Sequence, residues 1–383
     1  MKLAADWLDL PATRAVMEAL TGGGHGAWFV GGCVRNALLG QPVSDIDITT
    51  DARPERVIAL AEVAGIKAVP TGIDHGTVTL VAGHRPYEIT TLRRDVTTDG
   101  RRATIAFTDR LEEDAARRDF TMNALYADAG GNVLDPTGEG LADLAARRLR
   151  FIGLPEDRIH EDYLRILRFF RFHAWYADPA GGLDAEGLAA CAAGLDGLDR
   201  LSRERVGGEM KKLLAAPDPA PAMAAMAQTG VLARVLPGAE ARLLPILVEV
   251  ETGPPDPIRR LAALGGEDLT ERLRLSRAEG ARLHTLRAEM GTPTPPAALA
   301  YSHGAETARD ILLLRAALFE TPPDPAAEAQ IAKGAAAQFP VKPADLMPRL
   351  QGPALGAALK EMEADWIASG FTLTRTQLLR DHG

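Results

Sequence analysis

Residues 29–48 read Phe29-Val-Gly-Gly-Cys-Val-Arg-Asn-Ala-Leu-Leu-Gly-Gln-Pro-Val-Ser-Asp-Ile-Asp-Ile48, a stretch that predicts strand, tight turn, helix and strand. Trp28 to Val30 are apolar and β-prone, as expected of the first strand. The Gly31-Gly32 pair allows the backbone to turn and to approach a ligand closely. Val34 to Leu39 are expected to form a helix that Gly40 ends.

Two carboxylates follow on the second predicted strand. Asp45 and Asp47 are two residues apart, and side chains with this spacing share one face of a strand, so Ile46 and Ile48 face the core. Carboxylates held so close repel each other unless a cation lies between them. Mg²⁺ is a hard cation that commonly bridges carboxylates to substrate phosphates. On its own, however, Asp-Ile-Asp is more often a solvated pair at the end of a strand.

The residues upstream change this interpretation. A Gly-Gly pair, twelve residues and then Asp-x-Asp on a strand resemble the signature of polymerase-β-like nucleotidyltransferases. Gly-Gly-x-Val-Arg narrows the resemblance to the branch that holds class II tRNA CCA-adding enzymes and bacterial poly(A) polymerases. The resemblance implies that Asp45 and Asp47 are catalytic metal ligands for two Mg²⁺ ions, and that Gly32 and Arg35 bind the phosphates or sugar of a nucleotide. That branch usually has Asp where this chain has Asn36, so this position keeps an acceptor oxygen but carries no charge here.

Length and composition are those of a globular protein with more than one domain. A chain of 383 residues is too long to fold around one small hydrophobic core. No apolar run approaches the roughly 18 residues of a membrane span, and the first residues lack the apolar core of a signal peptide. Cys33 and Cys191 are too few and too distant for a disulfide framework or a metal cluster, which favours a reducing cytoplasm.

The net charge of −9 argues on its face against a nucleic-acid partner. Binding follows the local field, however, and the arginines are grouped beside the motifs. The groups are Arg93, Arg94, Arg101 and Arg102; Arg117 and Arg118; and Arg147, Arg148, Arg150, Arg165, Arg168 and Arg171. Charge runs are usually solvated faces, but their concentration here favours an anionic partner such as RNA.

The other elements of the head are predicted from periodicity and breakers. Residues 1–20 are expected to form an amphipathic helix, and a second helix is expected to begin near Asp51, a possible cap, and to end near Gly65. Three strands are expected at 67–69, 76–81 and 86–92. Residues 93–102 carry charges and β-breakers without apolar periodicity and predict a mobile loop beside the site.

Glu88 lies on the last of these strands. Related nucleotidyltransferases often add a third carboxylate from a later strand, which helps a metal or acts as a base. Glu88 therefore has two alternatives, a catalytic role of this kind or a simple ion pair with Arg93 or Arg94.

A second motif is Asp114-Ala-Ala-Arg-Arg-Asp-Phe-Thr-Met-Asn-Ala-Leu-Tyr126. Taken alone, it is a helix start with paired charges. Arg-Arg-Asp-Phe-Thr closely resembles the second motif of the family, which implies that Arg118 contacts the nucleotide and that Asp119 holds a ribose hydroxyl or fixes Arg118. The chemistry is compatible, because a guanidinium donates hydrogen bonds in a plane and a carboxylate accepts them.

The most informative motif for selectivity is Glu161-Asp-Tyr-Leu-Arg-Ile-Leu-Arg-Phe-Phe-Arg-Phe172. Asp162, Arg165, Arg168 and Arg171 recur every three residues along one predicted helix, so each neighbours the next. The alternative is an exposed helix stabilised by Asp–Arg pairs. The family resemblance implies that Asp162 and Arg165 read the incoming base, with Arg168 and Arg171 supporting them or the phosphates.

Elementary hydrogen bonding explains why such a pair selects C and A. Adenine and cytosine each present an amino donor beside a ring-nitrogen acceptor, which suits one carboxylate and one guanidinium. Guanine and uracil carry a ring N–H where the acceptor should be. Leaving buried polar groups unpaired costs about 1–3 kcal/mol each, enough for a strong preference.

From Leu201 onward the sequence is rich in Ala, Leu and Arg with helical periodicity and proline breaks. We therefore expect an α+β fold class: a nucleotidyltransferase head with a small mixed sheet and helices, then an all-α neck, body and tail. The expected boundaries are 1–145 for the head, 146–215 for the neck with the base-reading helix, 216–310 for the body, and 311–383 for a tRNA-binding tail.

The resemblance implies template-free transfer of CMP, CMP and AMP from CTP and ATP to the 3′ end of tRNA, with Mg²⁺ as cofactor. The oligomeric state is left open. One alternative is a polymerase that adds only A, either a poly(A) polymerase or an A-adding partner of a CC-adding enzyme. Thr71-Gly-Ile-Asp-His-Gly-Thr-Val78 differs from the Gly-Arg-Arg-Phe pattern associated with poly(A) polymerases.

Two further functions lie outside tRNA or poly(A) synthesis. A non-catalytic RNA- or nucleotide-binding relative is one of them, and the intact Asp45 and Asp47 speak against it. A small-molecule nucleotidyltransferase is the second, and the long helical half would have no use in it.

Overall fold

The computed structural model of the protein describes residues 1–99, 102–347 and 349–382, so Arg101 of the first arginine group lies outside the described residues. The chain divides into two compact units, Met1–Val235 and Leu236–Gly383, and each is considered by itself. No helix in the described ranges combines the length and the apolar character needed to cross a bilayer.

Seven strands of the first unit form one mixed sheet in the order β3-β4-β5-β2-β1-β8-β9. Neighbouring strands are antiparallel except β2 and β5, which run parallel. The strands are β1 (Ala27–Val30), β2 (Asp47–Thr50), β3 (Lys67–Gly72), β4 (Thr77–Ala82), β5 (Arg85–Thr91), β8 (Tyr126–Ala127) and β9 (Val133–Leu134). The small mixed sheet predicted for the head is therefore confirmed.

The turn between β1 and helix α2 (Gly32–Leu38) lies where the Gly-Gly pair predicted it. Gly31 has φ 72° and ψ −123°, a conformation open to glycine and strained for other residues. The strand after it begins at Asp47, so the prediction that Asp45 also lies on this strand is wrong. The reason is pairing: Phe29 faces Ile48 across the ladder, and two residues later the partner backbone turns away into α2.

Replacing Gly31 tests how much the turn depends on its backbone conformation. Gly31→Ala is expected to destabilise the protein by about 2 kcal/mol, because a side chain at this φ is strained. The new Cβ would also lie 3.6 Å from Arg118 Nη1. Urea denaturation measures the change. Gly208→Ala is the control, since a Cβ at Gly208 meets open space inside a helix and is expected to be neutral or slightly stabilising. Equal stability of the Gly31 variant and wild type would contradict the assignment.

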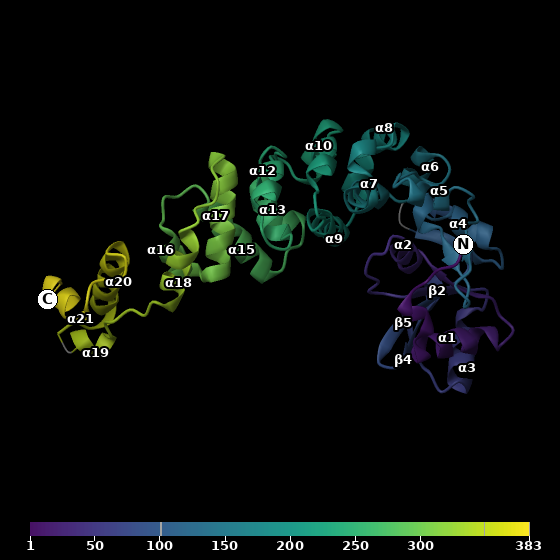
Figure 1. Ribbon diagram of the computed structural model, residues 1–383, viewed down its shortest axis with the longest axis horizontal. Coiled ribbons are helices and arrows are strands. Elements are labelled where there is room, and N and C mark those ends of the chain that lie inside the picture. Colours follow the sequence, from purple (N-terminus) through teal and green to yellow (C-terminus); the bar gives the residue numbers. More distant parts are fainter. Residues whose placement is uncertain (100–101, 348, 383) are drawn as a thin grey trace. The chain divides into compact units, whose positions relative to one another are not determined.

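Helices α1 (Pro11–Thr21) and α3 (Pro54–Val63) pack beside each other against the sheet (Figure 1). The Thr13 hydroxyl of α1 lies 3.0 Å from the Tyr87 hydroxyl of β5 in the buried interface. Side chains alternate along a strand, so Asp47 and Glu88, one residue from Ile48 and Tyr87, lie on the opposite face. The core face is thus covered by helices, and the carboxylates point away from it.

Two predicted helix starts differ from the structure. The first α-helix begins at Pro11 rather than within the first ten residues, which hold a short 3-10 helix at Asp6–Asp9. The second begins at Pro54, and Asp51 does not cap it. The Asp51 carboxylate instead accepts hydrogen bonds from the backbone amide of Gly26, at 3.1 Å, and lies 2.7 Å from His25 Nδ1.

The prediction of a loop at residues 93–102 is wrong, because the described residues of this stretch form strands. Strands β6 (Arg93–Asp99) and β7 (Arg102–Phe107) pair antiparallel as a separate two-stranded sheet. The prediction rested on the charged residues and overlooked β-branched residues such as Thr97 and Thr104, which favour extended backbone. The Arg93 carbonyl accepts a hydrogen bond from Arg117 Nε at 3.1 Å, so the ribbon joins the second motif.

Helices complete the first unit and connect the second motif to the predicted base-reading helix. Phe120, fully buried, packs its ring 4.9 Å from Phe151 and 5.1 Å from Phe172, measured between centroids. This aromatic cluster holds the residues just before Phe120 against α7. The helices are α4 (Leu111–Ala116), α5 (Gly140–Ala145), α6 (Pro155–Glu161), α7 (Leu164–Tyr176), α8 (Ala185–Ala193), α9 (Arg203–Leu214), α10 (Ala220–Gln228) and α11 (Val231–Val235).

The described elements of the second unit are helices, as predicted, and the α+β class with a helical remainder is confirmed. Arg259 and Arg260 are buried there against Glu251, and Asp310 accepts hydrogen bonds from Arg259 and Arg282. The helices are α12 (Leu243–Val250), α13 (Pro257–Leu264), α14 (Leu269–Arg272), α15 (Arg277–Glu289), α16 (Pro296–His303), α17 (Ala305–Phe319), α18 (Ala327–Ala336), α19 (Pro343–Leu346), α20 (Gly352–Ala368) and α21 (Arg375–Asp381).

Candidate active site

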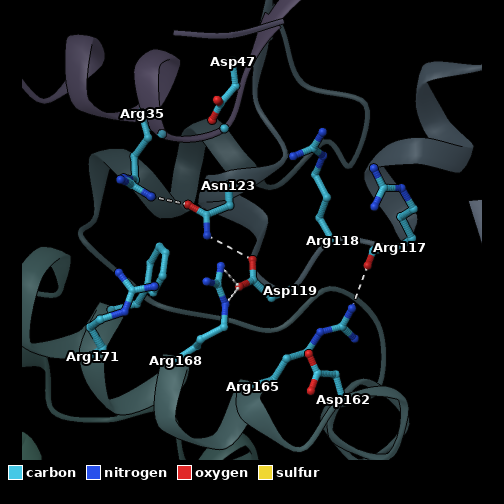
Figure 2. Close-up of a pocket in the computed structure, with 13 residues that line it drawn as sticks. Arg35, Asp47, Arg117, Arg118, Asp119, Asn123, Asp162, Arg165, Arg168 and Arg171 are labelled. Atoms are coloured by element: carbon cyan, nitrogen blue, oxygen red, sulfur yellow. Dashed lines mark hydrogen bonds and ion pairs between the residues drawn. The ribbon is translucent and has the colours of Figure 1, made fainter. Parts of the chain in front are cut away.

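A pocket of about 410 Å³ in the first unit brings the three sequence motifs together (Figure 2). Its volume lies within the roughly 300–1,000 Å³ of small-molecule sites. The lining residues come from the β1–α2 turn and α2, the start of β2, the second motif, the end of α6 and α7. They are Gly31, Gly32, Arg35, Asp47, Arg117, Arg118, Asp119, Asn123, Asp162, Arg165, Arg168, Arg171 and Phe172.

Asp47 is the carboxylate that reaches this pocket from the sheet. It is half-buried, and its pKa is raised to about 6, first by burial and then by the nearby charge of Glu88, with a smaller contribution from Asp45. Arg118 opposes the shift. Burial and like charges both destabilise the ionised form of a carboxylate, and a neighbouring cation stabilises it.

Asp45 and Glu88 are exposed and do not line the pocket. Glu88 is the parallel-strand neighbour of Asp47, which keeps the first of its two predicted alternatives open. The second alternative was an ion pair of Glu88 with Arg93 or Arg94. Arg94 instead pairs with Glu113 at 3.7 Å. Within the described ranges, no group of three or more His, Cys, Asp and Glu side chains is placed to hold a metal ion.

Arg35 is buried beneath the Gly-Gly turn and is held from several sides. Its Nη2 donates to the Asn36 side-chain oxygen at 2.8 Å and to the Tyr176 hydroxyl at 2.8 Å, and its Nη1 donates to Asn123. The guanidinium carbon lies 3.9 Å from the centroid of the Tyr176 ring. Burial lowers the pKa of Arg35. Asn36 thus orients Arg35 without neutralising it, since its amide carries no charge.

Arg117 and Arg118 share one buried carboxylate that the sequence interpretation did not single out. Asp114 is fully buried and accepts hydrogen bonds from Arg117 Nη2 at 2.6 Å, from Arg118 Nη2 at 2.9 Å and from the Tyr126 hydroxyl at 2.7 Å. The signal was present in the spacing, because residues three and four apart on a helix meet. Asp114 therefore sets the direction in which both arginines enter the pocket.

Asp114→Asn is expected to destabilise the protein by about 2 kcal/mol, because two guanidinium groups lose their charged acceptor. Burial alone raises the pKa of Asp114, but Arg118, Arg117 and Tyr126 together lower it to about 2, below its ordinary 3.8. A lowered native pKa stabilises the fold above the unfolded pKa, so this contribution is lost as the pH falls from about 4 to 2.

Urea denaturation at pH 7 and at pH 3 tests both parts of this expectation. The difference between wild type and Asp114→Asn should be smaller at pH 3. Glu113→Gln is the control on the same helix, because the ion pairs of Glu113 with Arg94 and Arg110 are long, partly exposed and worth at most about 1 kcal/mol. Equal losses for the two variants at pH 7 would count against a special role of Asp114.

Asp119 fixes a different arginine from the one predicted. It is buried, and its Oδ2 accepts from Arg168 Nε at 2.7 Å, whereas Arg118 is held by Asp114. Its Oδ1 accepts from Asn123 Nδ2 at 3.0 Å. Burial raises the pKa of Asp119, but Arg168 and Asn123 outweigh it and lower the pKa to about 2. Figure 2 shows the resulting chain of hydrogen bonds from Arg35 through Asn123 and Asp119 to Arg168.

Asp162 and Arg165 both line the pocket. The prediction that they lie on one helix is wrong, because Asp162 precedes α7. It ends α6 with an extended backbone, φ −155° and ψ 104°, and α7 begins at Leu164. Its Oδ1 accepts the Leu164 amide at 3.1 Å. An Asp side chain at this point competes for backbone amides, which favours a helix boundary over a helix interior.

Arg168 and Arg171 are on α7, as predicted, with a carboxylate from another helix behind them. Glu209 of α9 is buried and accepts from Arg171 Nε at 2.6 Å, and it lies 4.0 Å from Arg168 Nη1. Both guanidinium carbons lie over the Phe172 ring, at 5.1 Å for Arg168 and 4.4 Å for Arg171. Glu209 is almost 40 residues from this motif, so local spacing could not have identified it.

Positive charge dominates the pocket, since its lining residues include six arginines and three aspartates. Arginine forks match phosphate oxygens, and a half-buried site strengthens each charge interaction. The arrangement is suited to a polyanion near Asp47, with a polar group read at Asp162 and Arg165.

Two segments of the chain match family models. The model described as "Poly A polymerase head domain" matches residues 27–150, and the one described as "Probable RNA and SrmB- binding site of polymerase A" matches residues 183–243. The first segment contains the β1–α2 turn, Asp47 and the second motif, which together form more than half of the pocket lining.

Named relatives are similar over the same part of the chain. The human CCA tRNA nucleotidyltransferase 1, mitochondrial, is 41% identical over 202 residues, 52% of this chain and 46% of that protein. The CCA-adding enzyme of Streptococcus gordonii is 42% identical over 204 residues, 53% of this chain and 49% of that protein. The aligned part thus spans about half the length of these curated relatives.

Solved structures are similar over nearly the whole chain. The Bacillus stearothermophilus CCA-adding enzyme in complex with CTP has a TM-score of 0.78 at 30% identity, covering 94% of this chain and 92% of that chain. The Thermotoga maritima CCA-adding enzyme complexed with tRNA_CCA has a TM-score of 0.70 at 17% identity, covering 100% and 98%, and this likeness concerns the fold alone.

Proposed function

Because this chain belongs to the family of class II CCA-adding enzymes and poly(A) polymerases, we propose that it is a CCA-adding tRNA nucleotidyltransferase. The reaction is transfer of CMP, CMP and AMP from CTP and ATP to the 3′ end of tRNA, with release of pyrophosphate. The observation that carries the proposal is one pocket that joins Asp47, six arginines and the Asp162–Arg165 pair.

A divalent metal fits the residues at the edge of the sheet, and we propose Mg²⁺. Asp47 and Asp45 offer hard oxygen ligands, and the raised pKa of Asp47 reflects burial first and then the nearby charge of Glu88. Mg²⁺ usually takes one or two protein carboxylates and fills its other positions with water and substrate phosphates, so two carboxylates suffice. When bound, the metal lowers the pKa of the tRNA 3′-hydroxyl and neutralises the triphosphate and departing pyrophosphate. Glu88 is proposed to assist Asp47 from the neighbouring strand.

The chain's own residues bind and orient the nucleotide. Gly32 leaves room for the triphosphate beside the turn, where Arg35 and Arg118 present guanidinium groups that are already held in place. Arg168 and Arg171 add positive charge from α7. Asp119 organises this side of the pocket by holding Arg168, and a ribose hydroxyl remains a proposed partner of its carboxylate.

Asp162 and Arg165 are proposed to read the base. The carboxylate accepts a hydrogen bond from the amino group that adenine and cytosine share, and the guanidinium donates to the neighbouring ring nitrogen. Guanine and uracil present a ring N–H to the guanidinium and are rejected. No nucleic-acid template is needed, because protein groups supply the pairing edge.

The division into head, neck, body and tail at 1–145, 146–215, 216–310 and 311–383 remains our proposal, with tRNA bound along the helical part through backbone shape and phosphate contacts. A cytoplasmic location also remains a proposal, since the human relative has a mitochondrial name.

Purified protein incubated with tRNA that lacks its last three nucleotides tests the function. Extension by three nucleotides and no more, from CTP plus ATP, is the expected result. Long A tails, or incorporation of A without use of CTP, would replace this function with A addition. No incorporation with either nucleotide would favour a non-catalytic relative.

A further inference from the structure

A residue from outside the three motifs holds the carboxylate of the base-reading pair. Arg205 of α9 donates from Nη2 to Asp162 Oδ2 at 2.6 Å. The other carboxylate oxygen, Oδ1, accepts the Leu164 amide at 3.1 Å. Asp162 and Arg205 are each about 30% exposed, so both can respond to a bound ligand. The two contacts fix the plane of the carboxylate and leave it further lone pairs for a third donor.

Arg165 is held by a different carboxylate and by backbone carbonyls. It donates from Nη1 to Glu161 at 2.5 Å and to the Arg158 carbonyl at 2.9 Å, and from Nη2 to the Arg117 carbonyl at 2.8 Å. An acidic and a basic side chain three residues apart on a helix often pair with each other. Here Asp162 and Arg165 make their hydrogen bonds with different partners. An incoming nucleobase therefore does not have to break an Asp162–Arg165 ion pair before it binds.

We propose that Arg205 is a positioning residue that holds the Asp162 carboxylate in the orientation in which it accepts the amino group of the incoming base. This inference rests on the proposed function, because it assigns Asp162 to base reading. Arg205 does not line the pocket and acts through Asp162. Removing it is expected to weaken selection of C and A while the triphosphate site stays intact.

The helix that carries Arg205 is anchored at its start and along its buried side. The Ser202 side chain caps α9, and Met210 and Leu213 of this helix are buried. Glu209 lies four residues after Arg205, on the same face of the helix, and holds Arg171 of α7. One face of α9 thus holds both the carboxylate before α7 and an arginine in the middle of α7. Small displacements matter here, because a misplacement of about 1 Å can cost about 100-fold in rate.

The test compares kcat/KM for CTP with kcat/KM for UTP in single-nucleotide addition to truncated tRNA. Arg205→Ala is expected to reduce this ratio by about 10- to 100-fold. Arg205→Lys, which keeps a cationic donor, is expected to lose less. Lys212→Ala is the matched control, an exposed cation on the same helix that does not line the pocket, and should leave the ratio unchanged. Melting temperatures establish that each variant is folded.

A double-mutant cycle then separates positioning from direct reading. In the Asp162→Ala background, Arg205→Ala should change the CTP/UTP ratio no further. An undiminished effect in that background, an unchanged ratio in Arg205→Ala alone, or equal losses for Lys and Ala overturns the inference. Failure of the proposed function is recognised separately, since wild-type protein would then add no CMP to tRNA.

Discussion

Asp47→Asn is expected to reduce nucleotide addition to tRNA by roughly 100- to 1,000-fold. Asn keeps the shape of the side chain and one oxygen but removes the charge that would hold a divalent cation at the edge of the pocket. Asp47 is the carboxylate that the sheet presents to the lining arginines, so Asp45 and Glu88 cannot replace it from their exposed positions. Single-turnover addition of CMP at saturating Mg²⁺ measures the loss.

Asp51→Asn is the matched control for this prediction. Asp51 follows the same strand β2 but pairs with His25 and the Gly26 amide, away from the pocket lining. It should change turnover little, even where it lowers stability. Full turnover by Asp47→Asn would show that the proposed metal site is elsewhere.

Asp162→Ala is expected to reduce discrimination of CTP against UTP by about 10- to 100-fold, with a smaller effect on triphosphate binding. The amino group of cytosine would lose its acceptor, so the correct base would lose the advantage that the carboxylate confers. Arg165→Ala should act in the same direction, because the ring nitrogen would lose its donor. Kinetics with all four nucleotides measure the selectivity.

The position of Asp162 at a helix boundary shapes the design of this experiment. Its Oδ1 accepts a hydrogen bond from the amide of Leu164, the first residue of α7, so the Ala variant is also expected to lose about 1 kcal/mol of stability. The ratio of kcat/KM values is insensitive to the folded fraction, which makes it the proper readout. Asp162→Asn retains an acceptor for the Leu164 amide and separates the two effects. Unchanged selectivity in both variants would move base reading to another part of the pocket.

Most of the head was predictable because its signals are local. The Gly-Gly pair requires a turn, alternating apolar residues require strands, and the observed β1, α2 and β3 to β5 lie near their predicted positions. The errors occurred where the secondary structure depends on pairing with a distant strand and not on the adjacent residues. Asp45 fell outside the strand because its pairing partner turns into α2, and the charged stretch after Leu92 pairs into β6 and β7.

The sequence by itself determined the chemistry of this protein: which carboxylates, arginines and glycines it has, and the short spacings that place several of them on one strand or helix. Such spacings are read along a few residues, where backbone geometry leaves little freedom. Only the tertiary structure decided which charges meet. Asp119 holds Arg168, Glu209 holds Arg171, and Arg205 holds Asp162, across separations of about 40 to 50 residues. Charge interactions depend on distance in space and on burial, and both are set by packing between elements, such as the contact of Phe120 with Phe172.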